Sequence, residues 1–235
     1  MPNRFTTSTK KDGVGREKGL PLTVIVPAAG MGHRMKSYGP KCLLQANQKE
    51  TILEKTVINV KREYPYADII VVVGFESTKV INSLPHYVRI VENPQFEETS
   101  VVESIRLGIN ASATKNLLLI YGDLIFNVYS IRNLISSGPC AVIDSKSRFK
   151  DEEVGVTVVD DSITMFAYGL PNKWSQIIYF ENESFDMLKD LCSDKRKNKL
   201  YPFELFNIII ENGIEIEAKE PKGMVIKEID SLKDL

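Results

Sequence analysis

Two glycines and two cations follow the first apolar run of this chain. The stretch from Val24 to Leu44 reads VIVPAAGMGHRMKSYGPKCLL. Glycines let backbone N–H groups approach an anion closely, the planar fork of an arginine matches phosphate oxygens, and a lysine adds a point charge. The turn at residues 30–32, with Arg34 and Lys41 beyond it, therefore predicts a cradle for a triphosphate.

Two familiar glycine motifs do not fit this turn. The phosphate-binding P-loop needs Gly-Lys-Ser/Thr after four spacer residues, which the stretch lacks, and the dinucleotide fingerprint needs a third glycine where Met35 stands. A glycine pair alone more often marks a plain turn. On the glycines alone, an ordinary loop is the favoured alternative.

Apolar runs alternate with amphipathic segments along the first part of the chain, and these elements must position the turn. Buried strands are predicted over residues 22–28, 67–75, 88–94, 116–123 and 139–145. Helices are predicted over residues 51–64, 77–85, 100–112 and 128–138. Unbroken apolar strands separated by helices favour an α/β fold, with a mostly parallel sheet and helices on both faces. In such a sheet, ligands bind beyond the carboxyl ends of the strands, where the turn lies.

The pattern changes after about Lys146. Residues 152–170 alternate around Asp160-Asp161, which predicts a β-hairpin, and helices are predicted over residues 184–194 and 203–213. We expect a mobile N-terminal tail over 1–20 and a single domain over 21–235. Its nucleotide-binding half would cover 21–145, and an acceptor-binding half over 146–235 would form a hairpin and helix lid.

Composition excludes several classes of protein. Lys plus Arg number 30 and Asp plus Glu number 31, so there is no general basic field for nucleic acid. No apolar run is long enough to span a bilayer, and the N-terminus lacks the apolar core of a secretory signal. Cys42, Cys140 and Cys192 lie far apart, and with His33 and His86 they argue against a disulfide framework and a zinc site. A cytoplasmic location is expected.

The longer string PAAGMGHRMKSYGPKCLL resembles the signature of the nucleotidylyltransferases that activate sugar phosphates and phosphocholine. The matching residues are Ala28, Ala29, Gly30, Gly32, Arg34, Met35, Pro40 and Lys41. The resemblance implies a Rossmann-like fold of the glycosyltransferase-A type. It also implies nucleotide contacts at Ala28, Ala29, Gly30, Met31, Gly32 and His33.

Two further segments carry the same resemblance. LLLIYGD puts Asp123 at the end of an apolar strand, where the family's aspartate binds a divalent metal. VIKEIDSLKDL resembles the ending of the phosphocholine cytidylyltransferase-like branch, in which the aspartate matching Asp230 is the second metal ligand. Some sugar-phosphate uridylyltransferases have an asparagine there. The resemblance therefore implies Mg²⁺ held by Asp123 and Asp230.

The reaction implied is nucleotidyl transfer. An oxygen of the acceptor phosphate attacks the α-phosphorus of a nucleoside triphosphate, and pyrophosphate leaves. Arg34 would hold the β and γ phosphates, and Lys41 would bridge the α-phosphate and the acceptor phosphate. His33 would lie near phosphate without acting as a base, because the acceptor is already anionic. CTP is the favoured nucleotide because of the branch, and no residue excludes UTP or GTP.

The segment ENPQFEETSVVESIRLGI resembles the part of the family that closes over the base and starts the next helix. Asn93, Thr99 and Ser100 are the candidates there. Each could contact the base or cap the helix, and for Ser100 the cap has at least equal weight.

The acceptor side is predicted from the hairpin and the segment after it. This region resembles the acceptor-side hairpin of the phosphocholine-like branch, so Lys173 and Lys150 are candidates to bind the acceptor phosphate. The alternative, which we favour, is that both are exposed lysines with no specific role.

An aromatic cluster follows in the same region. It consists of Trp174, Tyr168, Tyr179 and Phe180, with Glu181, Glu153 or Glu204 as possible anionic partners. Such a box would suit a quaternary ammonium group such as choline. The alternative, which is favoured, is that these aromatics pack the lid.

Two other classes compete with the transferase. A glycosyltransferase of the same fold would want an Asp-x-Asp motif after the fourth strand, where YGDLIFN offers only Asp123. A non-catalytic nucleotide-binding module would not need Lys41 or the two aspartates. Pyrophosphate release that requires both substrates separates these classes, and the sequence predicts no oligomeric state.

Overall fold

The structure is a computed structural model that describes residues 21–31, 39–136, 138–147, 149–150, 152–230 and 234. The predicted tail over 1–20 lies outside the described residues, and so do residues 32–38, which include Gly32, His33 and Arg34 of the predicted phosphate site. The division into two halves at residue 145 stays a prediction.

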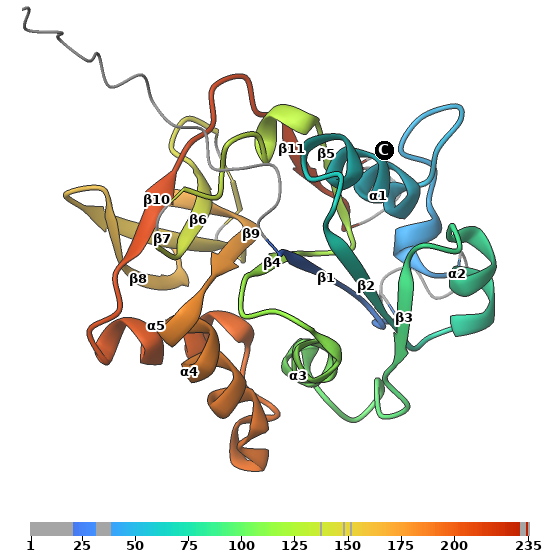
Figure 1. The fold of residues 1–235 in the computed structure, drawn as a ribbon. Helices are drawn as coiled ribbons and strands as arrows, with labels where there is room; N and C mark the ends of the chain where they lie inside the picture. Colours follow the sequence, from blue (N-terminus) through green and yellow to red (C-terminus); the bar gives the residue numbers. More distant parts are fainter. Residues whose placement is uncertain are drawn as a thin grey trace, which may run out of the picture.

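A nine-stranded sheet forms the centre of the fold, in the order β3-β2-β1-β4-β9-β6-β10-β8-β7 (Figure 1). Its strands are β1 (Thr23–Ala28), β2 (Asp68–Val73), β3 (Arg89–Glu92), β4 (Leu117–Ile120), β6 (Cys140–Asp144), β7 (Val154–Val159), β8 (Ser162–Tyr168), β9 (Asn172–Phe180) and β10 (Ile216–Lys219). A separate two-stranded ribbon joins β5 (Leu124–Phe126) to β11 (Ile226–Glu228).

The first four strands of the sheet, β3, β2, β1 and β4, are parallel to one another. They are the apolar runs of the sequence, and Val24 in β1 pairs with Ile69 on one side and Leu118 on the other. All three residues are buried, as expected for a strand covered on both faces. This part confirms the predicted α/β fold with a parallel sheet.

The sheet as a whole is mixed, because β9 runs antiparallel to both β4 and β6. This strand follows the predicted hairpin of β7 and β8, whose two-residue turn has positive φ at Asp160 and Asp161. Positive φ at both central residues is typical of tight hairpin turns, and it confirms the hairpin. The segment that forms β9 was not predicted as a strand, although it links the parallel half to the hairpin.

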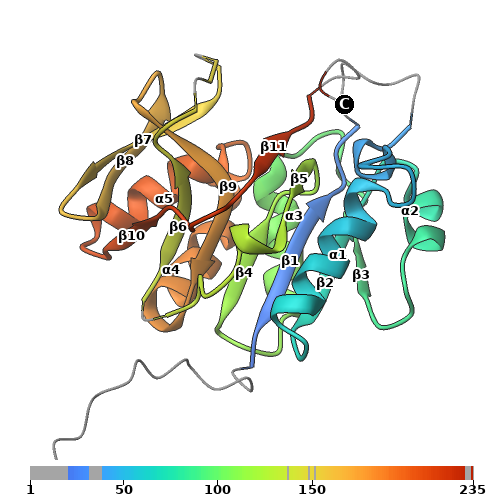
Figure 2. The ribbon, with the colours of Figure 1, turned by 90° about the horizontal axis from the view of Figure 1, so that it is seen from above.

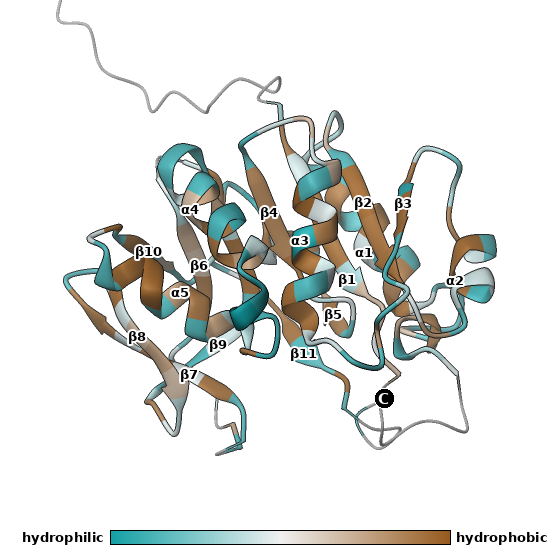
Figure 3. Ribbon diagram, turned by 90° about the horizontal axis from the view of Figure 1, so that it is seen from below, coloured by the Kyte–Doolittle hydropathy of each residue, from teal (hydrophilic) through white to brown (hydrophobic). Residues whose placement is uncertain are grey.

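Helices cover both faces of the sheet (Figure 2). They are α1 (Ile52–Glu63), α2 (Ser77–Ser83), α3 (Val101–Ala111), α4 (Asn182–Ser193) and α5 (Pro202–Glu211). Val57 of α1 lies in the core on one face, and Ile105 of α3 and Phe206 of α5 lie in the core on the other. Figure 3 shows β2 and β4 as mainly hydrophobic strands between these layers. No helix in the described part of the chain is long and apolar enough to cross a membrane.

The predicted helix over 128–138 is wrong. Only a short 3₁₀ turn, Val128–Ser130, forms there. Asn127 caps this turn by accepting a hydrogen bond from the Ser130 backbone, and its amide donates to the Gly223 carbonyl. The segment is therefore held to the chain just before β11, and this tertiary contact replaces further helical turns.

Candidate active site

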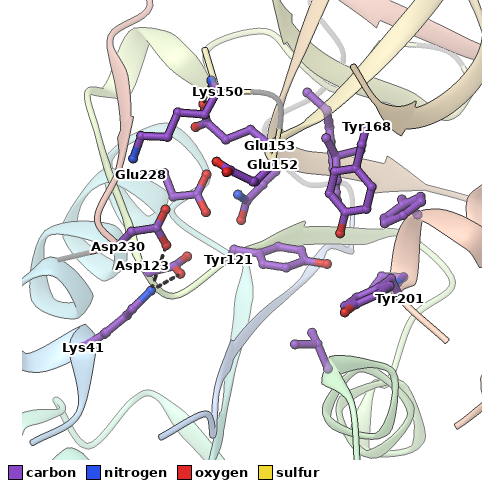
Figure 4. A pocket seen from close by; sticks show the side chains of 16 residues that line it. Lys41, Tyr121, Asp123, Lys150, Glu152, Glu153, Tyr168, Tyr201, Glu228 and Asp230 are labelled. Carbon is purple, nitrogen blue, oxygen red and sulfur yellow. Dashed lines mark hydrogen bonds and ion pairs between the residues drawn. The ribbon is translucent and has the colours of Figure 1, made fainter. Parts of the chain in front are cut away.

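Lys41, Asp123 and Asp230 come together from three segments that are far apart in the sequence (Figure 4). The Nζ of Lys41 lies 3.4 Å from Oδ2 of Asp123 and 3.2 Å from Oδ1 of Asp230. The two contacts span 82 and 189 residues of sequence. The cluster lies beyond the carboxyl ends of β1 and β4, the edge at which open α/β sheets bind ligands.

The position of Lys41 is set by a short 3₁₀ helix, Lys41–Leu43, which begins directly after Pro40. Leu44 follows this helix, and its carbonyl accepts a hydrogen bond from Ile52 at the start of α1. Cys42 is buried beside Lys41 and anchors the helix in the core. The 3₁₀ helix that carries Lys41 is therefore held against the start of α1 and the core.

Asp123 is placed by the close approach of the chain after β4 to the neighbouring parallel strand β1. A Cβ at Gly122 would lie 2.7 Å from the carbonyl oxygen of Pro27 in β1, so only glycine lets the chain pass there after β4. Asp230 is placed by the ribbon, in which Glu228 of β11 pairs with Leu124 of β5. The next residue, Ile229, donates its N–H to the Asp123 carbonyl at 3.0 Å. The two aspartates are thus held together by backbone hydrogen bonding.

Charge and burial oppose one another in this cluster. Burial raises the pKa of Asp123, and the ammonium of Lys41 works against that rise. Burial lowers the pKa of Lys41, but the charges of Asp123 and Asp230 outweigh it, so the pKa ends above its ordinary value. Lys41 is therefore a cation at neutral pH. The second oxygen of Asp123, Oδ1, is buried and has no hydrogen-bond partner among the residues that the structure describes.

The two aspartates suit a hard cation. Among the residues that the structure describes, no group of three or more His, Cys, Asp and Glu side chains is arranged to hold a metal. Mg²⁺ does not need such a cage, because it is usually bound by one or two carboxylates and completes its shell with water and substrate phosphates. The unpartnered oxygen of Asp123, close to a second carboxylate, fits that requirement.

A pocket of about 440 Å³ opens beside the cluster. Its polar lining includes five carboxylates and two lysines: Asp123, Glu152, Glu153, Glu228, Asp230, Lys41 and Lys150. Its apolar lining is mainly aromatic: Tyr121, Tyr168, Trp174, Tyr201 and Phe203. Figure 4 shows Glu228 beside the two aspartates and the ring of Tyr121 between this acidic end and the tyrosines. The pocket therefore combines an acidic end with an aromatic wall.

The two predicted acceptor lysines lie in different settings. Lys150 is exposed and lines the pocket. Lys173 is not exposed as predicted, because its side chain on β9 is only 19% accessible. It forms a close ion pair with Glu153 and lies 3.8 Å from Oε2 of Glu228. Lys173 itself does not line the pocket, and its charge is neutralised by these two carboxylates.

The predicted aromatic box divides into two groups. Trp174 and Tyr168 line the pocket, together with Glu153. Tyr179 and Phe180 do not, because both are fully buried in the sheet. The favoured packing alternative thus holds for Tyr179 and Phe180, and of the four aromatics only Trp174 and Tyr168 reach the pocket.

The predicted anionic partners divide in the same way. Glu181 accepts a hydrogen bond from Tyr179 and another from the backbone of Gly138, which ties it to the sheet. Glu204 caps α5 by accepting from the backbone of Tyr201. Neither residue lines the pocket, so of the three candidates only Glu153 is at the site.

Trp174 has a further property. It is 3% accessible, and its ring meets Tyr121, Phe166 and Phe206 edge-on, each at 5.6 Å. Its indole nitrogen has no hydrogen-bond partner within the described residues. Most of the Trp174 side chain is therefore packed in the core, and one side of it lines the pocket.

The described part of the glycine turn follows β1 directly. Ala28 and Ala29 are buried, Gly30 is exposed and Met31 is partly exposed. The carbonyl of Ala29 accepts a hydrogen bond from Phe75, which follows β2. The remaining predicted phosphate contacts, at Gly32, His33 and Arg34, lie outside the described residues, so these contacts stay predictions.

The three predicted base contacts lie between β3 and α3. Asn93 is buried and bonds to Ser104 and to the backbone of Gln95. Thr99 donates to the carbonyl of Gln95. Ser100 accepts a hydrogen bond from Val102 and so caps α3. The structure thus gives all three a local structural role, and a contact with the base stays a prediction.

The sequence analysis missed Glu228 and Gln176, which also line the pocket. Burial raises the pKa of Glu228 to about 7, helped by the nearby charge of Asp123. The spacing could have identified Glu228, because it lies two residues before Asp230 in an extended segment and so shares its face. No sequence signal indicates Gln176.

Comparison with known proteins agrees with this architecture. Solved structures with the same fold include CTP:phosphocholine cytidylyltransferase from Streptococcus pneumoniae, with 20% identity, a TM-score of 0.77, and coverage of 92% of this chain and 96% of that one. They also include the inositol-1-phosphate CTP transferase from T. maritima, with 17% identity, a TM-score of 0.75 and 92% coverage of both chains. At such identities the likeness concerns the fold alone.

Curated relatives are longer than this chain. The bifunctional protein GlmU of Solibacter usitatus is 32% identical over 149 residues, which is 60% of this chain and 31% of the relative. That of Lactococcus lactis is 25% identical over 213 residues, or 83% and 46%. This chain therefore matches less than half the length of either.

A family model covers most of the sequence. The model of the MobA-like NTP transferase domain matches residues 24–204, which span the parallel strands, the hairpin and the start of α5. The match includes Lys41 and Asp123, and Asp230 is added by the ribbon that follows. The chain belongs to the family of MobA-like NTP transferase domains.

Proposed function

We propose that this protein transfers a nucleotidyl group from a nucleoside triphosphate, with CTP favoured, to a small phosphorylated acceptor and releases pyrophosphate. The observation that carries the proposal is the meeting of Lys41, Asp123 and Asp230 at the mouth of the pocket. CTP is favoured because the sequence resembles the cytidylyltransferase branch, and two structures of the same fold are named for CTP-dependent transferases.

The transfer needs little covalent chemistry from the protein. An anionic oxygen of the acceptor phosphate forms a new bond to the α-phosphorus, the bond from that phosphorus to the bridging oxygen breaks, and pyrophosphate leaves with the electron pair. Lys41 would lie against the α-phosphate and the acceptor phosphate and reduce their repulsion. The raised pKa of Lys41 keeps it charged for this role. Arg34 and the turn at 30–32 would hold the leaving phosphates.

Asp123 and Asp230 would hold Mg²⁺, with Oδ1 of Asp123 as the available buried ligand atom. When bound, the metal supplies charge neutralisation for the phosphates. Lys41 already lies between the same carboxylates, so its ammonium neutralises them before a metal binds.

The pocket favours an acceptor that carries a positive group. Of the five carboxylates in the lining, Asp123 and Asp230 would bind the metal, and Glu153 is paired with Lys173. Glu152 and Glu228 remain for the acceptor. They lie near an aromatic wall that includes Tyr168 and Trp174, which is the setting that binds quaternary ammonium groups. We therefore place phosphocholine-like acceptors first. A sugar phosphate is the second candidate, since its hydroxyls could donate to the same carboxylates.

The test is pyrophosphate release with Mg²⁺ across CTP, UTP, GTP and ATP, each with phosphocholine, phosphoethanolamine and a set of sugar 1-phosphates. We expect release only with one nucleotide and one acceptor together. Hydrolysis of a nucleotide sugar would favour the glycosyltransferase. Triphosphate binding without release from any pair would favour a binding module, and absence of triphosphate binding would reject the proposal.

A further inference from the structure

Gln176 has a left-handed backbone inside the longest strand of the sheet. Its φ is +57°. The other non-glycine residues with positive φ in the described chain lie at turns or at helix starts: Glu76, Asn133, Asp160, Asp161 and Asn182. A left-handed conformation is costly for a residue with a side chain, and such conformations cluster at functional sites.

The cause of this conformation is a bulge in β9. Trp174 pairs with Ile143 of β6, but Ile178 pairs with Ala141. Three residues of β9, 175–177, therefore stand opposite one residue of β6. Bulges bend a strand and redirect a side chain, often next to active sites.

The bulge changes what Gln176 can contact. In a regular strand, residue 176 would share a face with Trp174 and Ile178, which are both buried in the core beneath α3, α4 and α5. An amide directed into that core would lack partners. In the structure Gln176 lines the pocket, and its carbonyl accepts a hydrogen bond from Tyr121, two residues before Asp123.

The Gln176 side chain shares the pocket lining with Glu228, and it opposes the rise that burial causes in the pKa of that carboxyl. Oε2 of Glu228 is buried and has no hydrogen-bond partner in the described part of the chain. The nearest cation, Lys173, is 3.8 Å from that oxygen and is paired more closely with Glu153. One carboxylate oxygen in the pocket wall is thus held in place and available to a ligand.

We propose that Gln176 is a positioning residue of the acceptor site, and that its left-handed backbone directs the amide against Glu228 so that Oε2 is presented to a cationic or hydrogen-bond-donating group of the acceptor. This inference rests on the proposed function. It assigns acceptor selection to the pair of Gln176 and Glu228, separate from the cluster of Lys41, Asp123 and Asp230 that handles the phosphates.

The test compares Gln176→Gly with Gln176→Asn in steady-state assays with CTP and phosphocholine, or with the acceptor that the wild-type protein uses. Glycine keeps the left-handed backbone but removes the amide, whereas asparagine tolerates that backbone and retains an amide. We expect Gln176→Gly to raise the KM for the acceptor about 10-fold, the loss typical of a hydrogen bond to a charged group. The KM for CTP should not change, and Gln176→Asn should recover part of the loss.

Stability provides the second measurement. Gln176→Gly relieves a strained backbone, so its melting temperature should equal or exceed that of the wild type, whereas a merely structural residue would lower it. Asn133→Gly is the matched control, because Asn133 also has positive φ and does not line the pocket. It should leave both KM values unchanged.

The two proposals fail differently. If the wild-type protein releases pyrophosphate with no pair of substrates, the proposed function fails and takes this inference with it. If the wild type is active but Gln176→Gly has an unchanged KM for the acceptor, only this inference is overturned. It is also overturned if the variant loses stability and raises the KM for acceptor and CTP alike.

Discussion

Two lysines of the pocket region, Lys41 and Lys173, each lie between two carboxylates. Their side chains are almost equally accessible, at 18% and 19%. Lys41 keeps both carboxylates beyond 3 Å, whereas Lys173 pairs closely with Glu153. The two lysines thus have similar neighbours and similar burial, but Lys173 is bound more tightly by its carboxylates than Lys41 is. In the proposed reaction Lys41 would transfer its contacts to phosphate oxygens, while the charge of Lys173 neutralises Glu153 and Glu228.

The largest expected effect comes from removing the available lysine. Lys41→Ala should lower kcat by about 100-fold or more, because it removes a cation from the transferring phosphates. Pyrophosphate release measures the rate, and circular dichroism checks that the fold persists. A loss below about threefold would show that Lys41 is no more available to substrate than Lys173.

The next effect concerns the two carboxylates that contact Lys41, those of Asp123 and Asp230. Asp230→Asn should weaken the apparent affinity for Mg²⁺ by about 10-fold, since an amide oxygen replaces a charged ligand atom. Asp123→Asn should weaken it further, because Oδ1 of Asp123 is the buried atom without a partner. Titration of activity with Mg²⁺ gives both values, and an unchanged midpoint in both variants would remove the metal site from this cluster.

For the second lysine we expect an effect on stability first. Lys173→Met would leave Glu153 and Glu228 without their cation in a largely buried wall, at a cost of about 2 kcal/mol after allowance for partial exposure. Urea unfolding measures this free energy. The double variant Lys173→Met/Glu153→Gln should recover part of it, and a single variant as stable as the wild type would contradict the pairing.

The smallest effect is on thiol reactivity near Lys41. Burial raises the pKa of Cys42 to about 12, and it does the same for Cys140 and Cys192. At pH 8 all three should be protonated, so native protein should react slowly with a thiol reagent and unfolded protein quickly. Faster labelling of Cys42 alone would show that the segment carrying Lys41 opens in solution, with the other two thiols as internal controls.

The parallel half of the fold and the residues of the charged cluster could be predicted, because their signals are local. Unbroken apolar runs identified β1, β2 and β4, and a motif placed Asp123 at the end of its strand. The resemblance paired Asp123 with Asp230 as metal ligands and gave Lys41 a separate phosphate role. The structure brings all three residues together. Contacts made by residues 32–38 stay predictions.

The acceptor side was less predictable, because it depends on long-range pairing. The segment of β9 contains Lys173, Ser175 and Gln176, so it lacks the apolar run of a central strand. Its place between β4 and β6 comes from the hairpin before it. The bulge at Gln176 follows from that pairing, and so does the burial of Lys173, which the sequence analysis had treated as an exposed residue.

The ribbon of β5 and β11 has a consequence for the order in which the site is completed during synthesis. Lys41 and Asp123 leave the ribosome long before Asp230, which is 189 residues after Lys41. Closing so long a loop carries an entropic cost that the pairing of β11 must offset. A nascent chain that has formed only its parallel strands therefore holds two of the three residues of the charged cluster. If the proposed function is right, activity should therefore appear only late in folding, once β11 has paired with β5.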